Sequence, residues 1–181
     1  MALAGFVLRA GFAKGDGVSV EFEGKVALVT GGARGIGLSI AEALVREGAS
    51  VFICGRNPAT LKTTLGQLRS FGSQTSAAGV VADVRRNNDC CNLVQKAATR
   101  FGRLDILVNN ASVGIFKPVD QLTADDWDAT IQTNLSSVFY CAAKPFQLCG
   151  SKVEGTSLTS QACWPTMVLP KVPHTVLLNL V

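Results

Sequence analysis

The sequence of 181 residues predicts an α/β fold with a doubly wound parallel sheet. Two observations support this fold class. Short apolar runs alternate with segments of about a dozen residues that carry apolar side chains at helical spacing, which is the pattern of parallel βαβ units. The first apolar run is followed at once by Gly31, Gly35 and Gly37, as in a strand joined to a helix by a glycine-rich turn.

The elements follow in order from Lys25. Residues 26–30 form a β-branched run that predicts a buried strand, and residues 36–47 have helical periodicity. Pro58 suits the first turn of a later helix, and Thr123 suits the cap of another, with acids in its first turn. The remaining predicted elements are strands at 50–54, 77–82 and 104–109, a helix at 88–101 and a last helix that runs from Thr123 toward Ala143.

Composition excludes several classes of protein. A hydrophobic content of 48% with 17% charged residues is typical of a soluble globular domain, and no apolar run approaches the roughly 18 residues of a membrane-spanning helix. The net charge of +4 is scattered, so we expect neither a nucleic-acid nor a membrane partner. The six cysteines lack metal-ligand spacing, so we expect reduced thiols, no metal site and an intracellular, most simply cytoplasmic, protein.

The first 21 residues precede the predicted sheet. Residues 1–14 contain Arg9, Lys14, several apolar side chains and no acid. Two interpretations stay open, a short organellar import sequence or a loose N-terminal extension, and we favour the extension over residues 1–21.

The glycine-rich turn is Thr30-Gly31-Gly32-Ala33-Arg34-Gly35-Ile36-Gly37. Glycines allow the backbone to approach a pyrophosphate, and a helix that begins at the turn supplies N–H groups and the positive end of its dipole. The turn therefore predicts a nucleotide-binding site after the first strand.

Four further motifs accompany the turn: Asp83-Val84, Asp105, Asn109-Asn110-Ala111-Ser112 and Thr133-Asn134-Leu135. With the turn and these motifs in order, the chain resembles the short-chain dehydrogenase/reductase family, a single-domain Rossmann family, and within it the group of 3-oxoacyl carrier-protein reductases. Ser112 stands where the family usually has glycine. The resemblance covers about residues 22–143.

The resemblance implies an oxidoreductase that interconverts a small-molecule carbonyl and an alcohol by hydride transfer, usually as a homo-oligomer. It also implies roles for particular residues. Asn134 would be catalytic, holding a water in the proton relay. Asp83 and Val84 would meet the adenine, and Asn110 and Ala111 would lie beside the nicotinamide ribose. The pyrophosphate and the adenosine phosphate would be lined by Gly31, Arg34, Gly35, Ile36 and Gly37.

The end of the second strand indicates the cofactor. A site for NAD places a carboxylate there, to accept a hydrogen bond from the ribose 2′-hydroxyl. This chain has Gly55-Arg56-Asn57 instead, and Arg56 together with Arg34 could pair with a 2′-phosphate. We therefore expect NADP(H) rather than NAD; the alternative is that Arg56 is only a solvated loop charge.

The family's catalytic tyrosine and lysine have the spacing Tyr-x-x-x-Lys, which Tyr140 and Lys144 match as letters. Tyr140 comes only six residues after Asn134, on the same predicted helix, and the family's serine would fall at Trp127. We interpret Tyr140 and Lys144 as neighbours on a helix face without a catalytic role. The chain is then expected to be catalytically impaired, because it lacks the family's Ser/Tyr/Lys set.

Residues 144–181 break the pattern, since four prolines occur there without helical or strand periodicity. A shift of two nucleotides over residues 174–181 permits codons for Tyr-Ser-Ala-Ser-Lys-Phe-Gly, the family's active-site signature, and over residues 158–162 it permits Asn-Ile-Ser-Ser. We therefore interpret the tail as out of frame, from a frameshift or an altered splice, after a partial Rossmann domain at 22–143.

An out-of-frame tail has consequences for the fold and function. We expect the sheet to be incomplete in its C-terminal half, without a fifth strand, so that the fourth strand is an edge. The family's oligomer surface would then also be incomplete. The alternative functions are a non-catalytic nucleotide-binding remnant and a truncated product without function.

Overall fold

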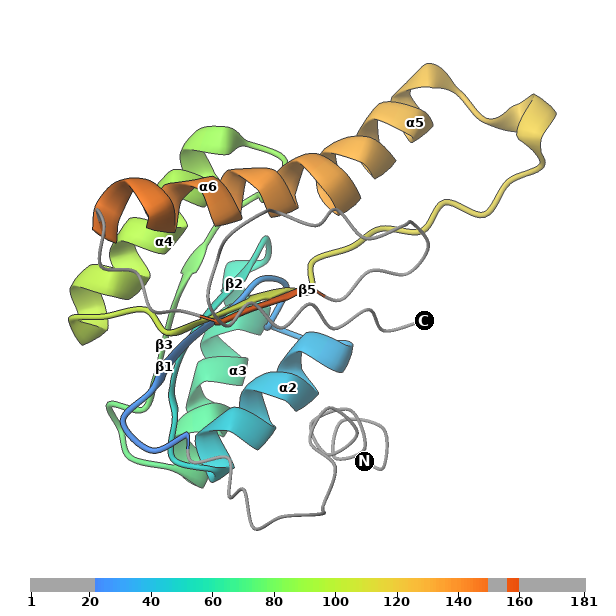
Figure 1. Cartoon of the computed structure of the whole chain (residues 1–181). Helices are drawn as coiled ribbons and strands as arrows, with labels where there is room; N and C mark the ends of the chain where they lie inside the picture. Colours follow the sequence, from blue (N-terminus) through green and yellow to red (C-terminus); the bar gives the residue numbers. More distant parts are fainter. Residues whose placement is uncertain (1–21, 150–155, 160–181) are drawn as a thin grey trace, which may run out of the picture.

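The computed structural model describes residues 22–149 and 156–159, which form a parallel sheet with helices on both faces (Figure 1). The strand order is β3-β2-β1-β4-β5, and each neighbouring pair is parallel. The predicted doubly wound α/β fold is confirmed. The strands are β1 (Val26–Val29), β2 (Ser50–Gly55), β3 (Ala77–Val81), β4 (Ile106–Asn109) and β5 (Thr156–Thr159).

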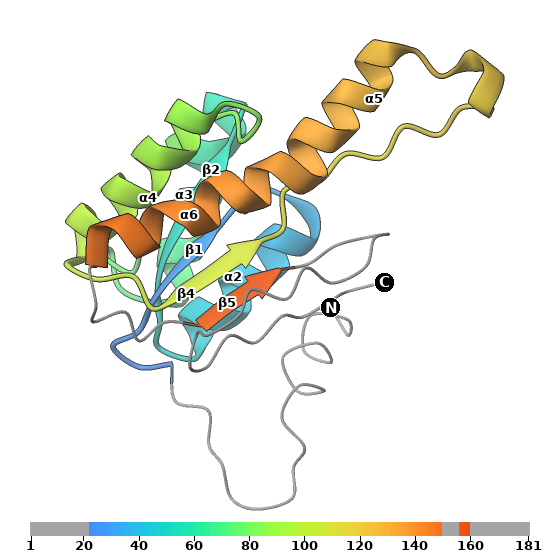
Figure 2. The ribbon, with the colours of Figure 1, turned by 45° about the horizontal axis from the view of Figure 1, so that its top comes forward.

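Two helices cover each face of the sheet (Figures 1 and 2), and a separate apolar core lies between each pair of helices and the sheet. Helices α2 (Gly35–Arg46) and α3 (Pro58–Phe71) pack on one face, and α4 (Asn87–Phe101) and α6 (Ser137–Cys149) on the other. Along β1 the buried side chains alternate between the faces: Ala27 and Val29 join the first core, and Leu28 joins the second. This alternation is the period of two that a strand imposes, here with both faces buried.

The connection from β4 to α6 leaves the body of the sheet and returns to it (Figures 1 and 2). It contains the short 3₁₀ helix η1 (Val119–Gln121), the helix α5 (Ala124–Ile131) and a π-helical segment η2 (Gln132–Ser136) that leads directly into α6. The predicted cap at Thr123 is present, because its hydroxyl accepts from the Asp126 N–H at 3.1 Å while the Asp126 carboxylate accepts from the Thr123 N–H at 3.0 Å. This capping box begins α5.

The expectation that the fifth strand is absent is wrong. Strand β5 pairs with β4 in parallel, with Ile106 opposite Thr156 and Asn109 opposite Thr159, so β4 is not a sheet edge. Strand β5 has only four residues, two of which are threonine. A parallel ladder needs only their backbone N–H and C=O groups. The strand is visible beside β4 in Figure 2.

The last helix also extends further than expected, from Ala143 to Cys149, through Pro145. A proline inside a helix removes one backbone hydrogen bond, to the carbonyl four residues earlier, and the rest of the helical ladder can continue around it. The extension at residues 1–21, the later prolines and the shifted-frame tyrosine signature over residues 174–181 lie outside the described residues. In the described part of the chain, none of the helices combines the length and apolarity required to cross a bilayer.

Candidate nucleotide-binding site

The carboxyl ends of β1 and β4 bring the glycine-rich turn and the Asn110-Ala111 segment together. Thr30, at the end of β1, connects them through its hydroxyl. The hydroxyl donates to the Val108 carbonyl at 3.3 Å and accepts from the N–H groups of Asn110 and Ala111, both at 3.0 Å. Thr30 is buried, so these bonds fix the two loops relative to each other in the interior.

The Asn110 side chain contacts the backbone of the glycine-rich turn and supports it. Its Nδ2 donates to the Thr30 carbonyl at 3.0 Å and lies 3.5 Å from the Gly31 carbonyl oxygen. A Cβ at Gly37 would overlap Asn110 Nδ2 and lie 2.5 Å from the Gly31 carbonyl oxygen. Position 37 therefore requires glycine, because the first turn of α2 packs directly on this support.

The turn is open on its outer side at Gly35. Gly31 and Gly35 have φ angles of +65° and +56°, which favour glycine, and a Cβ at Gly35 would meet nothing within 4 Å. The first amide of α2 to donate within the helix is that of Leu38, to the Arg34 carbonyl at 3.3 Å. The amides of residues 35–37 precede that ladder, and the first helical turn contains no acid, so this helix end fits an anionic pyrophosphate.

Both predicted phosphate-binding arginines lie at the ends of neighbouring strands. Arg34 follows Ala33 in the turn after β1, and Arg56 follows Gly55 at the end of β2; both arginines are exposed. A Cβ at Gly55 would lie 2.8 Å from the Ala33 Cβ, so the two loops are in direct contact at the residues that precede the two arginines. Neither the turn after β1 (residues 30–37) nor the loop after β2 (residues 55–57) contains an acidic residue.

Asp83 follows β3 and lies at the same edge of the sheet. Its carboxylate accepts from Arg85 Nε at 3.0 Å, and its N–H donates to the Asp89 carboxylate at 2.9 Å. The hydrogen bond from Arg85 is the main reason that the pKa of Asp83 lies below its usual value, and the charge of Arg56 contributes in the same direction. Val84 is buried in the core beneath α4.

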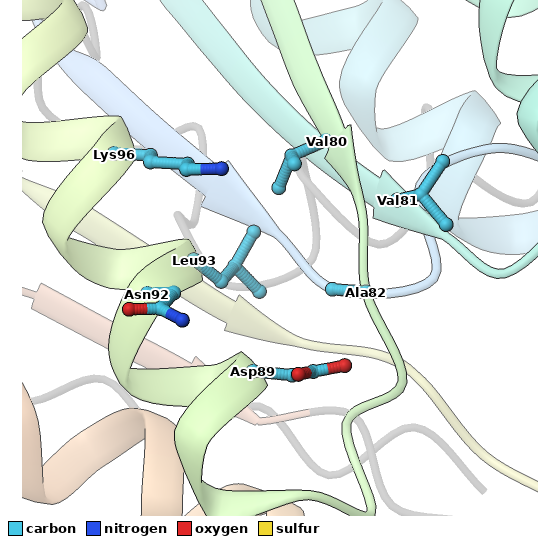
Figure 3. A pocket seen from close by; sticks show the side chains of 7 residues that line it. All are labelled: Val80, Val81, Ala82, Asp89, Asn92, Leu93 and Lys96. Carbon is cyan, nitrogen blue, oxygen red and sulfur yellow. The ribbon is translucent and has the colours of Figure 1, made fainter.

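A small pocket opens beside this segment, between the edge strand β3 and helix α4 (Figure 3). It contains none of the predicted nucleotide-binding residues, and the Asp89 carboxylate in its wall is already bonded to the Asp83 amide. The pocket is therefore a feature of the sheet edge next to the candidate site. Its walls are Val80, Val81, Ala82, Asp89, Asn92, Leu93 and Lys96.

Asn134 lies in the π-helical segment η2 and faces the loop that follows β4. Its Oδ1 accepts from the Val113 N–H at 2.9 Å, and its Nδ2 donates to the Val113 carbonyl at 2.9 Å. Single-turn π segments occur often at functional sites. The side chain thus connects the α6 helical unit to the loop that carries Asn110 and Ala111.

Tyr140 lies away from this arrangement. It is half-buried and packs against the apolar core between the sheet and helices α4 and α6, called here the α4-side core. Its ring makes an edge-to-face contact with Phe139, with 6.1 Å between the ring centroids. Six residues of helix separate it from Asn134, which corresponds to roughly 9 Å along the axis at 1.5 Å per residue. This placement supports the interpretation that Tyr140 is a structural residue.

The sequence interpretation missed two residues that position the site. The role of Thr30 as the connection between β1 and β4 was not assigned. Thr64 of α3 donates its hydroxyl to the Ala33 carbonyl at 2.8 Å. The signal for Thr64 was available, since it interrupts an apolar helix stripe formed by Leu61 and Leu68.

Comparison with known proteins places this geometry in a family. The family model for short chain dehydrogenases matches residues 25–166, and so extends beyond the boundary at 143 that the motifs indicated. The chain is 37% identical over 123 residues to the 3-oxoacyl-acyl-carrier-protein reductase FabG of Chlamydia pneumoniae, which covers 68% of this chain and 49% of that protein. A short chain dehydrogenase/reductase of Colletotrichum higginsianum is 40% identical over 120 residues, 66% of this chain and 44% of that protein.

Solved structures agree. A short chain dehydrogenase from Burkholderia cenocepacia in complex with NADP has a TM-score of 0.72 and 34% identity, over 79% of this chain and 57% of that one. The RhlG/NADP active-site complex of Pseudomonas aeruginosa has a TM-score of 0.69 and 32% identity, over 78% and 57%. This chain spans about half the length of the curated relatives that it matches. On the family match, the identities and the nucleotide turn together, the chain belongs to the short-chain dehydrogenase/reductase family.

Proposed function

We propose that this chain binds NADP(H) at the carboxyl edge of β1, β2 and β4, as a member of a family of oxidoreductases that interconvert carbonyls and alcohols. The observation that carries the proposal is the contact between the turn after β1 and the end of β2, with Arg34 and Arg56 on either side and no carboxylate in either loop. Two solved relatives were determined with NADP. NAD is the less favoured cofactor.

Each predicted residue has a place in this proposal. The amides at the start of α2, from Gly35 to Gly37, hold the pyrophosphate, and Gly31 allows it to approach. Arg34 and Arg56 hold the 2′-phosphate as charge-assisted hydrogen-bond donors. The adenine lies against the segment of Asp83 and Val84, and the nicotinamide ribose lies against Asn110 and Ala111.

When bound, the nicotinamide ring supplies or accepts the hydride. The chain's own residues must then orient the ring and move a proton at the substrate oxygen. In the proposal, Asn134 keeps the loop beside the ribose in place and holds a water of the proton relay. Tyr140 does not serve as the proton donor, because it packs into the α4-side core.

We therefore propose nucleotide binding as the activity of this chain, with turnover impaired. Loss of a positioned general acid typically lowers the rate by about 10²- to 10⁴-fold. The substrate class by family is a small-molecule carbonyl or alcohol, and the location is inside the cell. The second candidate function is a nucleotide-binding module with no turnover at all, in contrast to residual turnover. The position of Tyr140 favours it, since none of the described side chains at the site supplies a tyrosine.

The proposal is tested by thermal unfolding of the full 181-residue chain with NADPH, with NADH and without nucleotide. A ligand at 100 times its Kd stabilises the folded state by about 2.7 kcal/mol. We expect a higher Tm with NADPH than with NADH at equal concentration. No shift with either nucleotide would refute nucleotide binding, and oxidation of NADPH that depends on an added carbonyl substrate would show that turnover is retained.

The division of the chain also stays a proposal. We propose that residues 1–21 are an extension and that residues 144–181 are translated out of frame, although the family match continues to residue 166. The coding DNA decides this. Codons that cannot encode tyrosine and lysine in the shifted frame over residues 174–181 would refute it.

A further inference from the structure

Helix α3 has a hydroxyl group in its apolar stripe. Its buried residues are Leu61, Thr64 and Leu68, and Thr64 is only 4% exposed. A buried hydroxyl needs a hydrogen-bond partner, whereas an aliphatic side chain at the same position would not. The buried hydroxyl of Thr64 must therefore have a hydrogen-bond partner.

The partner of Thr64 lies outside its own helix. Threonine inside a helix commonly donates to the carbonyl four residues earlier, as the exposed Thr63 does to the Ala59 carbonyl at 3.2 Å. Thr64 instead donates to the carbonyl of Ala33, 31 residues earlier in the chain, at 2.8 Å. The bond connects α3 to the nucleotide turn from behind.

Ala33 is the residue at which the two arginine loops meet. Its carbonyl belongs to the peptide that leads into Arg34, and its Cβ occupies the space that a Cβ at Gly55 would need, 2.8 Å away. Arg56 follows Gly55 directly, and α3 begins just after it with Asn57 as its cap. Thr64 therefore lies behind the contact that sets the spacing between the two arginines.

We propose that Thr64 is a specificity-determining residue for the 2′-phosphate of NADP(H). By holding the Ala33 carbonyl, its hydroxyl fixes the peptide before Arg34 against Gly55, and so fixes the distance from Arg34 to Arg56. This inference rests on the proposed NADP(H) binding. The pyrophosphate site at the start of α2 is supported separately by Thr30 and Asn110, so NADH binding should depend little on Thr64.

The test compares the affinities of the full chain for NADPH and NADH, measured by calorimetry, in four proteins. Thr64→Val removes the hydroxyl and keeps the shape, and Thr64→Ser keeps the hydroxyl. Thr63→Val is the matched control, since it removes the exposed hydroxyl next to it. We expect Thr64→Val to raise the Kd for NADPH about tenfold and that for NADH less than about twofold, while Thr64→Ser and Thr63→Val stay near wild type.

Several results would overturn the inference. Equal weakening of NADPH and NADH in Thr64→Val would mean that the residue supports the whole turn and not phosphate selection. Loss of selectivity in Thr64→Ser would assign the effect to the methyl group. If Thr64→Val does not fold, Thr64→Ala replaces it in the comparison, and if neither variant folds, Thr64 is a stability residue only. If the wild-type chain binds neither nucleotide, or binds both equally, the proposed function itself fails, which is distinguishable because it appears before any substitution.

Discussion

Asn134 and Val113 form a reciprocal pair of hydrogen bonds, with the Val113 N–H donating to Asn134 Oδ1 and Asn134 Nδ2 donating to the Val113 carbonyl, each at 2.9 Å. An asparagine side chain here completes the backbone pairing of a residue in an irregular loop. The loop begins at Asn110 and Ala111, which also bond to Thr30. The segment of residues 110–113 is therefore fixed at both ends, by Thr30 at its start and by Asn134 at Val113.

Replacement of Asn134 by leucine should release this loop. The two hydrogen bonds with Val113 are lost, each with a net contribution of about 0.5 to 1.5 kcal/mol, so we expect faster hydrogen exchange at the Val113 amide and a destabilisation of at least about 1 to 3 kcal/mol. Gln132→Leu in the same π-helical segment is the control, because Gln132 is exposed. Unchanged exchange at Val113 in Asn134→Leu would mean that other contacts hold the loop.

Removal of the two arginines should affect NADPH more than NADH. Arg34→Ala and Arg56→Ala each remove a cation beside the proposed 2′-phosphate, so each should raise the Kd for NADPH by about tenfold or more. The selectivity of the wild-type chain should also fall as salt concentration rises, because exposed charges are screened. Titration by fluorescence of bound NADPH measures both effects.

Arg100→Ala is the control for net charge in that experiment. Arg100 lies in the last turn of α4, whereas the nucleotide site lies at the edge of the sheet where α4 begins. Its removal should change neither affinity. If Arg100→Ala lowers the affinity for NADPH as much as Arg56→Ala does, the effect comes from the net positive charge of the chain and not from a local phosphate-binding site.

Gly37 and Gly66 provide a matched pair of glycine-to-alanine substitutions in helices. At Gly37 a Cβ would overlap Asn110 Nδ2, so Gly37→Ala should displace the support of the turn and abolish nucleotide binding. At Gly66 a Cβ would meet nothing within 4 Å, and Gly66→Ala should stabilise α3 by about 0.4 to 1 kcal/mol. Urea unfolding and nucleotide titration of both variants check this; a Gly37→Ala variant that binds normally would contradict the packing.

The sequence could predict the nucleotide turn because its requirements are local. A glycine with positive φ, such as Gly31 or Gly35, is needed wherever a strand joins a helix through so tight a turn, and the helix amides follow from the backbone alone. The parallel sheet was predictable for a similar reason, since the apolar runs are buried on both faces.

The features that the sequence did not predict depend on contacts between distant segments. The acceptor of Thr64 lies 31 residues away, and the partner of Asn134 lies 21 residues away. No periodicity indicates such pairs. Strand β5 was missed because four residues that include two threonines carry little strand signal until β4 offers an edge with which to pair.

The cap of α5 should give a stability term that depends on pH. Asp126 accepts from the Thr123 N–H at 3.0 Å and pairs with Lys117 Nζ at 2.6 Å. The hydrogen bond from Lys117, followed by those from Thr123, lowers the pKa of Asp126 from 3.8 to about 2. Because the folded-state pKa is the lower one, the contribution is fully present above the unfolded value and is lost as pH falls through the folded value.

The measurement is the difference in urea midpoint between the wild-type chain and Asp126→Asn at several pH values. Asparagine keeps an acceptor for the Thr123 N–H and loses the charge. We expect a constant deficit in Asp126→Asn between pH 7 and pH 5. The deficit shrinks from about pH 4, where the carboxylate is protonated in the unfolded chain, to about pH 2, where it is also protonated in the folded chain. Asp125→Asn, in the same helical turn but outside the capping box, should show no such change. A deficit that stays constant down to pH 2 would show that the charge of Asp126 does not contribute, and that the cap acts through its hydrogen bonds alone.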